Sequence, residues 1–185
     1  MQTSFMIKIW KKFYMNWKLH LTLGTVSGIA GGLCLLSNPA WAAGYTITCT
    51  ISSLFSDLDS PMSKLGRTTP MISKFCNKMF GHRGLLHTPC FLFVSWLCYF
   101  NLSKNIYESN AFWMMYGFSV GFLCHMIQDL FTKGGIKLLY PFSKKRFHLT
   151  NFKSKSKMHN CITVPLIILS VFIVPKMTIY IMNFF

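Results

Sequence analysis

The sequence predicts an all-α protein, a polytopic membrane helix bundle of about four to five transmembrane helices. Of its 185 residues, 52% are apolar and only 12% are charged, whereas charged residues make up about a quarter of an ordinary soluble domain. The apolar residues also gather in stretches near the length of about 20 residues that a helix needs to cross a bilayer. A chain of this size is therefore expected to form one membrane domain.

Five stretches are proposed as membrane spans. They follow a basic extension at residues 1–18 and divide a single membrane domain that occupies residues 19–185. The second stretch is the most polar, although its serine and threonine hydroxyls can hydrogen-bond between packed helices. The proposed spans lie near residues 19–36, 39–56, 85–101, 111–131 and 161–183.

The basic residues predict how these spans are oriented, because lysine and arginine accumulate in cytoplasmic loops. If the N-terminus is cytoplasmic, every basic residue except Lys104 and Lys176 falls in a cytoplasmic segment. The charge pattern thus predicts a multi-pass protein with a cytoplasmic N-terminus. Two alternatives stay open at this end: cleavage of a signal peptide after the Ala-Trp-Ala at 40–42, and a later start at Met6 or Met15.

Net charge and cysteine content exclude other classes of protein. The charge of +15 would suit nucleic-acid binding, but the lysines lie in gaps between apolar stretches and lack interleaved stacking aromatics. We expect no nucleic-acid partner, and the basic tract that ends at Lys157 can instead contact anionic lipid headgroups. The seven cysteines show no C-x-x-C spacing, which predicts reduced packing residues and no zinc ribbon or disulfide framework.

Three of the four acidic residues lie at proposed membrane boundaries beside histidines: Asp57, Asp59 and Asp129. An aspartate at the centre of a span costs about 2.5 to 3.5 kcal/mol, and less near its end. A bound metal would offset that cost. His125 and Asp129 are four residues apart, so on a helix they share a face and can reach one ion. The alternative for this pair is a hydrogen bond that only joins helices.

Two further motifs flank the site. Asp57 and Asp59 close the second span, where Pro61 favours an exit from the helix, or Asp59 simply caps the next segment. In His82-Arg83-Gly84-Leu85-Leu86-His87, the glycine permits a turn that brings both imidazoles to one side. Arg83 offers a forked donor to an oxyanion such as phosphate, or is only an interfacial charge. At the cytoplasmic ends of four spans lie His20, Asp57, Asp59, His82, His87, His125 and Asp129.

Imidazole and carboxylate ligands together suit a divalent metal, with zinc favoured and manganese or iron as alternatives. An open coordination position lowers the pKa of bound water, which predicts hydrolysis of an ester or phosphoester at the cytoplasmic face. Arg83 is expected to stabilise the oxyanion, and Asp59 or Asp57 can act as general base. The glycine-containing segment 132–142 is a candidate cover for the site. The sequence leaves one or two metals possible.

Several motifs resemble the YdjM family of bacterial inner-membrane proteins, for which metal-dependent hydrolysis has been suggested. The resemblance rests on Asp-Leu-Asp at 57–59, His-Arg-Gly-x-x-His at 82–87 and Gly-Phe-Leu-Cys-His-x-x-x-Asp-Leu-x-Thr from 121, and covers about residues 18–150. It implies that all seven candidates above are metal-site residues and, through a distant similarity to zinc-dependent phospholipase C and P1-type nucleases, a phosphoester substrate. The chain departs from the family pattern at Ser56, Ser60 and Cys124, and Ser60 removes one candidate ligand.

A non-enzymatic membrane protein is the main rival, with a structural metal site or an ion-transport path. The depth of the polar residues discriminates between the two, because a transporter needs ionisable groups near the bilayer centre and on both sides. Here they gather on one side. The expected partners are the lipid bilayer and a lipid or phosphoester substrate, and the sequence makes no prediction of the oligomeric state.

Overall fold

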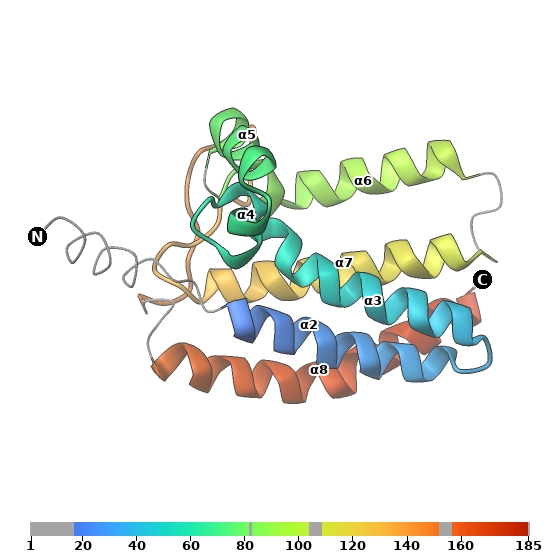
Figure 1. Cartoon of the computed structure of the whole chain (residues 1–185). Coiled ribbons are helices and arrows are strands. Elements are labelled where there is room, and N and C mark those ends of the chain that lie inside the picture. The colour runs from blue at the N-terminus through green and yellow to red at the C-terminus, as the bar shows by residue number, and fades with distance from the viewer. Residues whose placement is uncertain (1–16, 82, 104–108, 152–156, 185) are drawn as a thin grey trace, which may run out of the picture.

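The computed structural model describes residues 17–81, 83–103, 109–151 and 157–184, in which the regular elements are helices. Figure 1 shows five longer helices that run in the same general direction, with two short helices at one end. This arrangement confirms the all-α class. In chain order the elements are α2 (Trp17–Gly32), η1 (Leu33–Leu35), α3 (Pro39–Phe55), η2 (Ser56–Asp59), α4 (Lys64–Thr68), α5 (Pro70–Phe80), η3 (Leu85–His87), α6 (Pro89–Leu102), α7 (Asn110–Leu130) and α8 (Lys157–Phe184).

The five longer helices correspond to the five proposed spans, with shifted ends. The third begins at Pro89, four residues later than proposed, because residues 85–87 form the 3₁₀ turn η3. Proline suits the first position of a helix, where its missing N–H is not needed. The side chain of Asn38 caps α3 by accepting a hydrogen bond from the backbone N–H of Trp41 at 3.3 Å.

Among the described residues, one helix has both the length and the apolarity of a membrane span. It is α8, within Cys161–Phe184, and 22% of its most apolar stretch is buried in the protein. The other long helices are α2, α3 and α7, whose packing faces contain glycine and polar residues. Helix α6 is apolar but short. A bundle with four to five crossings therefore stays a prediction.

The two ends of the bundle differ in chemistry. One end, which we call the polar end, holds the start of α2, the ends of α3 and α7, the start of α6 and of α8, and the short helices α4 and α5 (Figure 1). The opposite end is an aromatic core around Tyr45, Phe112 and Trp113. The ring of Trp41 is tilted against that of Trp113, with 6.0 Å between ring centroids. The ionisable residues of interest all belong to the polar end.

Close contact between α3 and α7 depends on two glycines of α7. A Cβ atom at Gly121 would collide with the carbonyl oxygen of Cys49, and one at Gly117 would collide with that of Tyr45. The four-residue spacing of small residues lets two helix backbones approach closely, as in other membrane helix pairs. This contact fixes the end of α3 beside the end of α7 and so sets the position of the site.

We predict that Gly121→Leu destabilises the protein in detergent by at least about 2 kcal/mol, because overpacking against a backbone leaves no flexible neighbour to move. Ala111→Leu is the matched control, since it adds a similar side chain at an exposed position of the same helix. Thermal unfolding monitored by size-exclusion chromatography measures the difference. Equal melting temperatures for the two variants would contradict the packing argument.

Candidate metal centre

Six of the seven predicted site residues converge at the polar end, and all six are buried. His20 comes from the start of α2, His87 from η3, and His125 and Asp129 from the last two turns of α7. Asp57 and Asp59 come from η2, directly after α3. The seventh, His82, lies outside the described residues. Six of the predicted residues thus lie close together, contributed by four separate segments.

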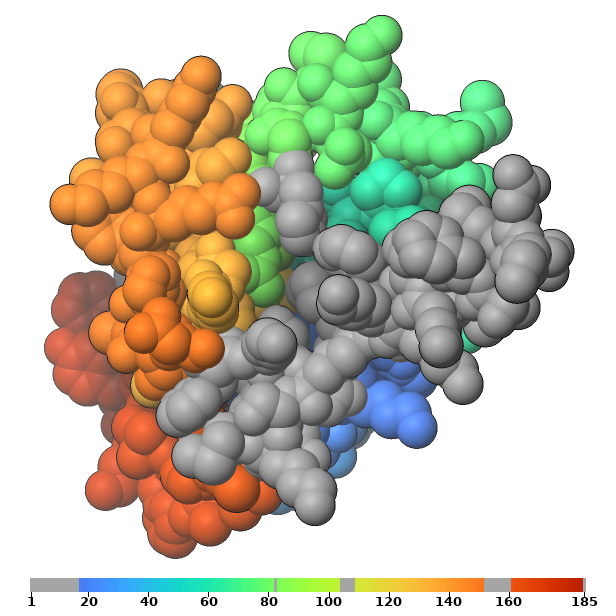
Figure 2. All heavy atoms as spheres, turned by 90° about the vertical axis from the view of Figure 1, so that its left-hand side faces the viewer, coloured from blue at the N-terminus to red at the C-terminus, as the bar shows by residue number. Residues whose placement is uncertain are grey.

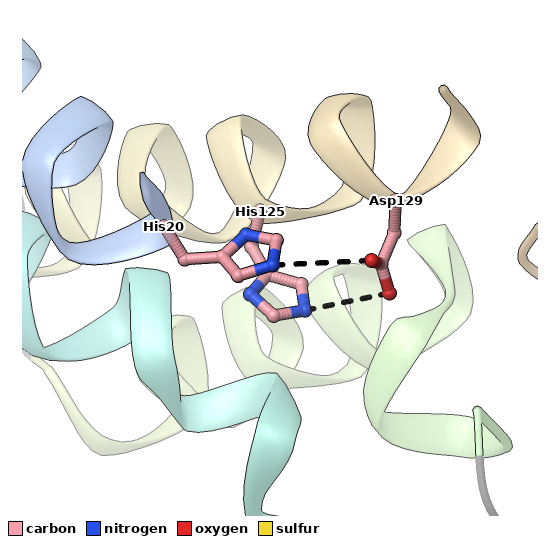
Figure 3. Close-up of side chains that lie close together, drawn as sticks. All are labelled: His20, His125 and Asp129. Carbon is pink, nitrogen blue, oxygen red and sulfur yellow. Dashed lines mark ion pairs between the residues drawn. The ribbon is translucent and has the colours of Figure 1, made fainter. Parts of the chain in front are cut away.

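Figure 3 shows His20, His125 and Asp129 directed toward one another between α2 and α7. The imidazoles of His20 and His125 stack with 4.2 Å between ring centroids. Nε2 of His20 is 3.9 Å from Oδ1 of Asp129, and Nε2 of His125 is 3.7 Å from Oδ2 of the same carboxylate. The predicted helical pair of His125 and Asp129 is thus observed, with a third residue from a distant part of the chain.

The two central histidines are held from behind by oxygen acceptors. Nδ1 of His125 lies 2.7 Å from the carbonyl oxygen of Ser53, and Nδ1 of His87 lies 3.1 Å from Oδ2 of Asp59. A carbonyl or carboxylate oxygen can only accept, so in each neutral imidazole Nδ1 carries the proton and Nε2 carries a lone pair. Such outer hydrogen bonds orient histidines that bind metals.

Both lone pairs point into the same small space. The Nε2 atoms of His87 and His125 are 3.3 Å apart, and Nε2 of His87 is also 3.5 Å from Oδ2 of Asp129. Neutral imidazoles in this arrangement place only electron-rich atoms against one another. A positive charge must therefore lie among them, either a bound cation or a proton on one imidazole.

Asp57 adds a carboxylate that has no hydrogen-bond partner among the described residues. It is 1% exposed, and neither of its oxygens is hydrogen-bonded. Burial raises the pKa of the Asp57 carboxyl. A buried carboxylate without a partner is costly unless a cation compensates it. This orphaned group is the strongest indication within the cluster that the residues fit a metal.

Two overlapping groups of three residues could hold a metal ion. One group is Asp57, His87 and His125, the other is His20, His125 and Asp129, and in each group the ligand atoms lie within 4.8 Å of one another. Asp59 belongs to neither group, because it faces the rear of His87 and the backbone N–H of Gly84 at 3.3 Å. Its position is that of an orienting residue behind a ligand.

Arg83 is engaged within the protein in a way that the sequence did not reveal. Its guanidinium donates to Oδ1 of Asp129 at 2.8 Å, to the carbonyl oxygen of Gly135 at 2.9 Å and to the hydroxyl of Thr132 at 3.1 Å. Its backbone adopts φ +55°, and a Cβ atom at Gly134 would collide with the guanidinium. The glycine segment after α7 thus accommodates Arg83 and is tied to Asp129.

Other contacts at the site come from residues that carried no recognisable sequence signal. Gln128 joins α7 to α2 by donating from Nε2 to the carbonyl oxygen of Leu19 at 3.1 Å. Asn77 of α5 donates to the carbonyl oxygen of Asp59 at 2.7 Å. In Figure 2, which faces the polar end, α4 and α5 (green) lie on one side and residues 131–151 (orange) on the other. The candidate ligands that lie between these segments are buried.

We predict that Arg83→Met lowers the free energy of unfolding by about 3–5 kcal/mol, because it leaves the buried Asp129 carboxylate uncompensated. Arg146→Met is the control: Arg146 makes one exposed bond to Gly134, and a surface change of this kind usually alters stability by less than about 0.5 kcal/mol. Denaturant unfolding in detergent with a chelator present measures both. Adding Asp129→Asn to Arg83→Met should recover part of the loss, and a further additive loss would disprove the pairing.

Comparison with known proteins identifies the family. The sequence profile described as YdjM inner membrane protein matches residues 15–184. The chain is 31% identical over 127 residues to the uncharacterized protein YvsG of Bacillus subtilis (strain 168), across 69% of this chain and 74% of that protein. It is 33% identical over 105 residues to the inner membrane proteins YdjM of Escherichia coli (strain K12) and Shigella flexneri, across 54% of this chain and only 50% of either relative. No solved structure matches. The chain belongs to the YdjM family of bacterial inner membrane proteins, as its motifs predicted.

Proposed function

We propose that this protein is a metal-dependent hydrolase of the bacterial inner membrane, which cleaves an ester or phosphoester at the cytoplasmic face. The observation that carries the proposal is the meeting of two imidazole lone pairs, 3.3 Å apart, with the unpartnered buried carboxylate of Asp57. Such a donor set fits zinc, manganese or iron, with zinc favoured. When bound, a divalent cation supplies Lewis acidity and lowers the pKa of a coordinated water.

The arrangement favours one ion at a time. His125 belongs to both groups of candidate ligands, but its Nδ1 is occupied by the carbonyl oxygen of Ser53. Only Nε2 remains to face the cluster, and a single lone pair serves a single ion. The two groups are therefore alternative positions within one centre, where His20, Asp57, His87, His125 and Asp129 supply the ligands.

The remaining polar residues take positioning roles in this proposal. Asp59 holds the ring of His87 through Nδ1, and the Ser53 carbonyl does the same for His125. Arg83 orients Asp129 and fixes the segment after α7, so the sequence-based role of Arg83 in oxyanion stabilisation is replaced by positioning. Asp57 and Asp59 both stay within the centre as candidate proton acceptors, and both carboxylate oxygens of Asp57 are buried without a hydrogen-bond partner.

We also propose a multi-pass topology with the polar end in the cytoplasm. The basic residues of the described segments lie at the polar end, with Lys176 of α8 as the exception. Helix α5 is suited to the lipid headgroup region, because Met71, Phe75 and Met79 are exposed on it beside Lys74 and Lys78. With α8 crossing the bilayer and α2, α3, α6 and α7 packed alongside, the metal centre lies near the inner-leaflet surface.

An ion transporter is the second candidate function, and the structure gives it less support. All three described aspartates are at the polar end, while the opposite end is filled by the aromatic core around Tyr45, Phe112 and Trp113. A transport path requires ionisable groups at other depths as well. Among the residues that the structure describes, α2, α3 and α7 offer no such series.

We predict that Asp57→Asn abolishes stoichiometric binding of zinc or manganese and leaves the metal-free protein at least as stable as the wild type. The substitution removes both a ligand and an uncompensated buried charge. Added metal should then stabilise the wild type by about 2.7 kcal/mol at a hundredfold excess over its Kd, and should not stabilise the variant. Elemental analysis and thermal unfolding provide the readings. If the variant retains full metal content, the proposed centre is wrong.

We further predict phosphodiester or phosphomonoester hydrolysis that requires added divalent metal, is absent in His125→Ala and survives in Arg146→Met. Asp59→Asn should lower the rate about 10–100-fold, because it weakens the orientation of His87, with partial recovery at higher metal concentration. Chromogenic esters in detergent or nanodiscs report the rate. Stoichiometric metal with no hydrolysis of any ester would favour a structural metal site.

A further inference from the structure

A separate apolar crevice lies between α7 and α8. It has a volume of about 230 Å³ and is bordered by Leu123 and Ile127 of α7, Leu169 and Ile173 of α8 and Leu23 of α2. Its two serines are turned away from a ligand: Ser119 donates to the carbonyl oxygen of Met115 at 2.9 Å, and Ser170 to that of Ile167 at 2.8 Å. Apart from Tyr116 and Cys124, the other side chains of the lining are apolar, so the crevice favours an occupant that is mainly apolar.

The crevice opens toward the surface that contacts lipid. Leu123, Leu169 and Ile173 are between 43% and 51% exposed, so the rim of the crevice is accessible from outside the protein. One wall is α8, the helix with the length and apolarity of a membrane span. In an inner membrane protein the medium around such a helix is hydrocarbon, so the molecules that reach the crevice are lipid chains.

Its length matches one leaflet of a bilayer. The lining runs from Tyr116 to Ile127 on α7 and from Leu166 to Met177 on α8. Each of these pairs is eleven residues apart, which is roughly 16 Å along a helix. Half of a hydrocarbon core of about 30 Å is about 15 Å. The axial span of the lining thus matches the length of an acyl chain in one leaflet.

One end of the crevice approaches the metal centre. Leu23 lies three residues after His20, so these side chains are neighbours on α2, with about 5–6 Å between Cβ atoms. On α7, Gln128 stands between Ile127 of the crevice and Asp129 of the centre. Oε1 of Gln128 is buried and has no hydrogen-bond partner among the described residues. This side chain is 1% exposed and does not line the crevice.

We propose that the crevice between α7 and α8 binds one acyl chain of a phospholipid from the cytoplasmic leaflet, and that its headgroup then lies beside the metal centre. A membrane phospholipid thereby becomes the substrate class. The assignment as substrate rests on the proposed hydrolase function, whereas the binding of the chain does not.

The test uses the full chain in vesicles of phosphatidylethanolamine and phosphatidylglycerol that contain a phosphatidylcholine with a photoactivatable diazirine in one acyl chain. After irradiation, mass spectrometry of peptides should place the adducts on the crevice residues of α7 and α8. Ser170→Phe should reduce these adducts about tenfold, because the ring displaces the equivalent of two methylene groups of the chain. Val171→Phe, at the next position and outside the crevice lining, should leave them unchanged.

Leu123→Phe provides a second filling variant if Ser170→Phe does not fold. Adducts spread evenly over α6 and α8, or unaltered by either filling variant, would overturn the proposal. Labelling by a photoactivatable free fatty acid but not by the phospholipid would also overturn it. So would a change of oligomeric state as the only effect of Ser170→Phe, because a second copy of the chain would then be the occupant. Asp57→Asn should keep the adducts while it loses the metal. If the wild type forms crevice adducts but binds no metal, the hydrolase function is refuted and the lipid site is not. If it hydrolyses esters but forms no crevice adducts, the lipid site is refuted and the hydrolase function is not.

Discussion

The buried meeting of imidazole lone pairs and carboxylates at the polar end is the interaction on which the rest of this structure depends. Electron-rich atoms do not stay together in an apolar protein without a positive charge among them. The segment after α3, the end of α7 and the turn η3 before α6 must therefore meet so that Asp57, His125 and His87 reach the same point. The glycines of α7 serve that requirement, because they let α3 approach closely enough to bring Ser53 behind His125.

The centre is also rigid because hydrogen bonds from outside the cluster hold its two central histidines. Each central histidine is fixed at Nδ1, one by a backbone carbonyl and the other by Asp59, so neither ring can turn its Nε2 atom away. Asp59 is in turn held by α5 through the bond from Asn77 to its carbonyl oxygen. Motion of α5 is thereby connected to the imidazole ring of His87. This connection runs through hydrogen bonds and needs no movement of the longer helices.

Much of the fold and of the cluster could be predicted from the sequence, because both depend on spacing and on residue type. Apolar stretches gave the five longer helices, and the rarity of acids in the chain drew attention to Asp57, Asp59 and Asp129. The different roles of the residues could not be predicted. A backbone carbonyl such as that of Ser53 leaves no trace in a sequence, and the direction of Arg83 depends on its positive φ and on the space at Gly134. The number of crossings stays open because the packing faces of α2, α3 and α7 contain polar residues.

The ion pair between Arg83 and Asp129 sets the formal charge of the cluster. With Asp57, Asp59 and Asp129 all ionised, the guanidinium of Arg83 cancels one of the three negative charges and leaves two. In the proposed metal-loaded centre, a divalent ion would balance these two charges. Under that proposal, loss of Arg83 would leave one more negative charge in the cluster and would shift its preference toward ions of higher charge.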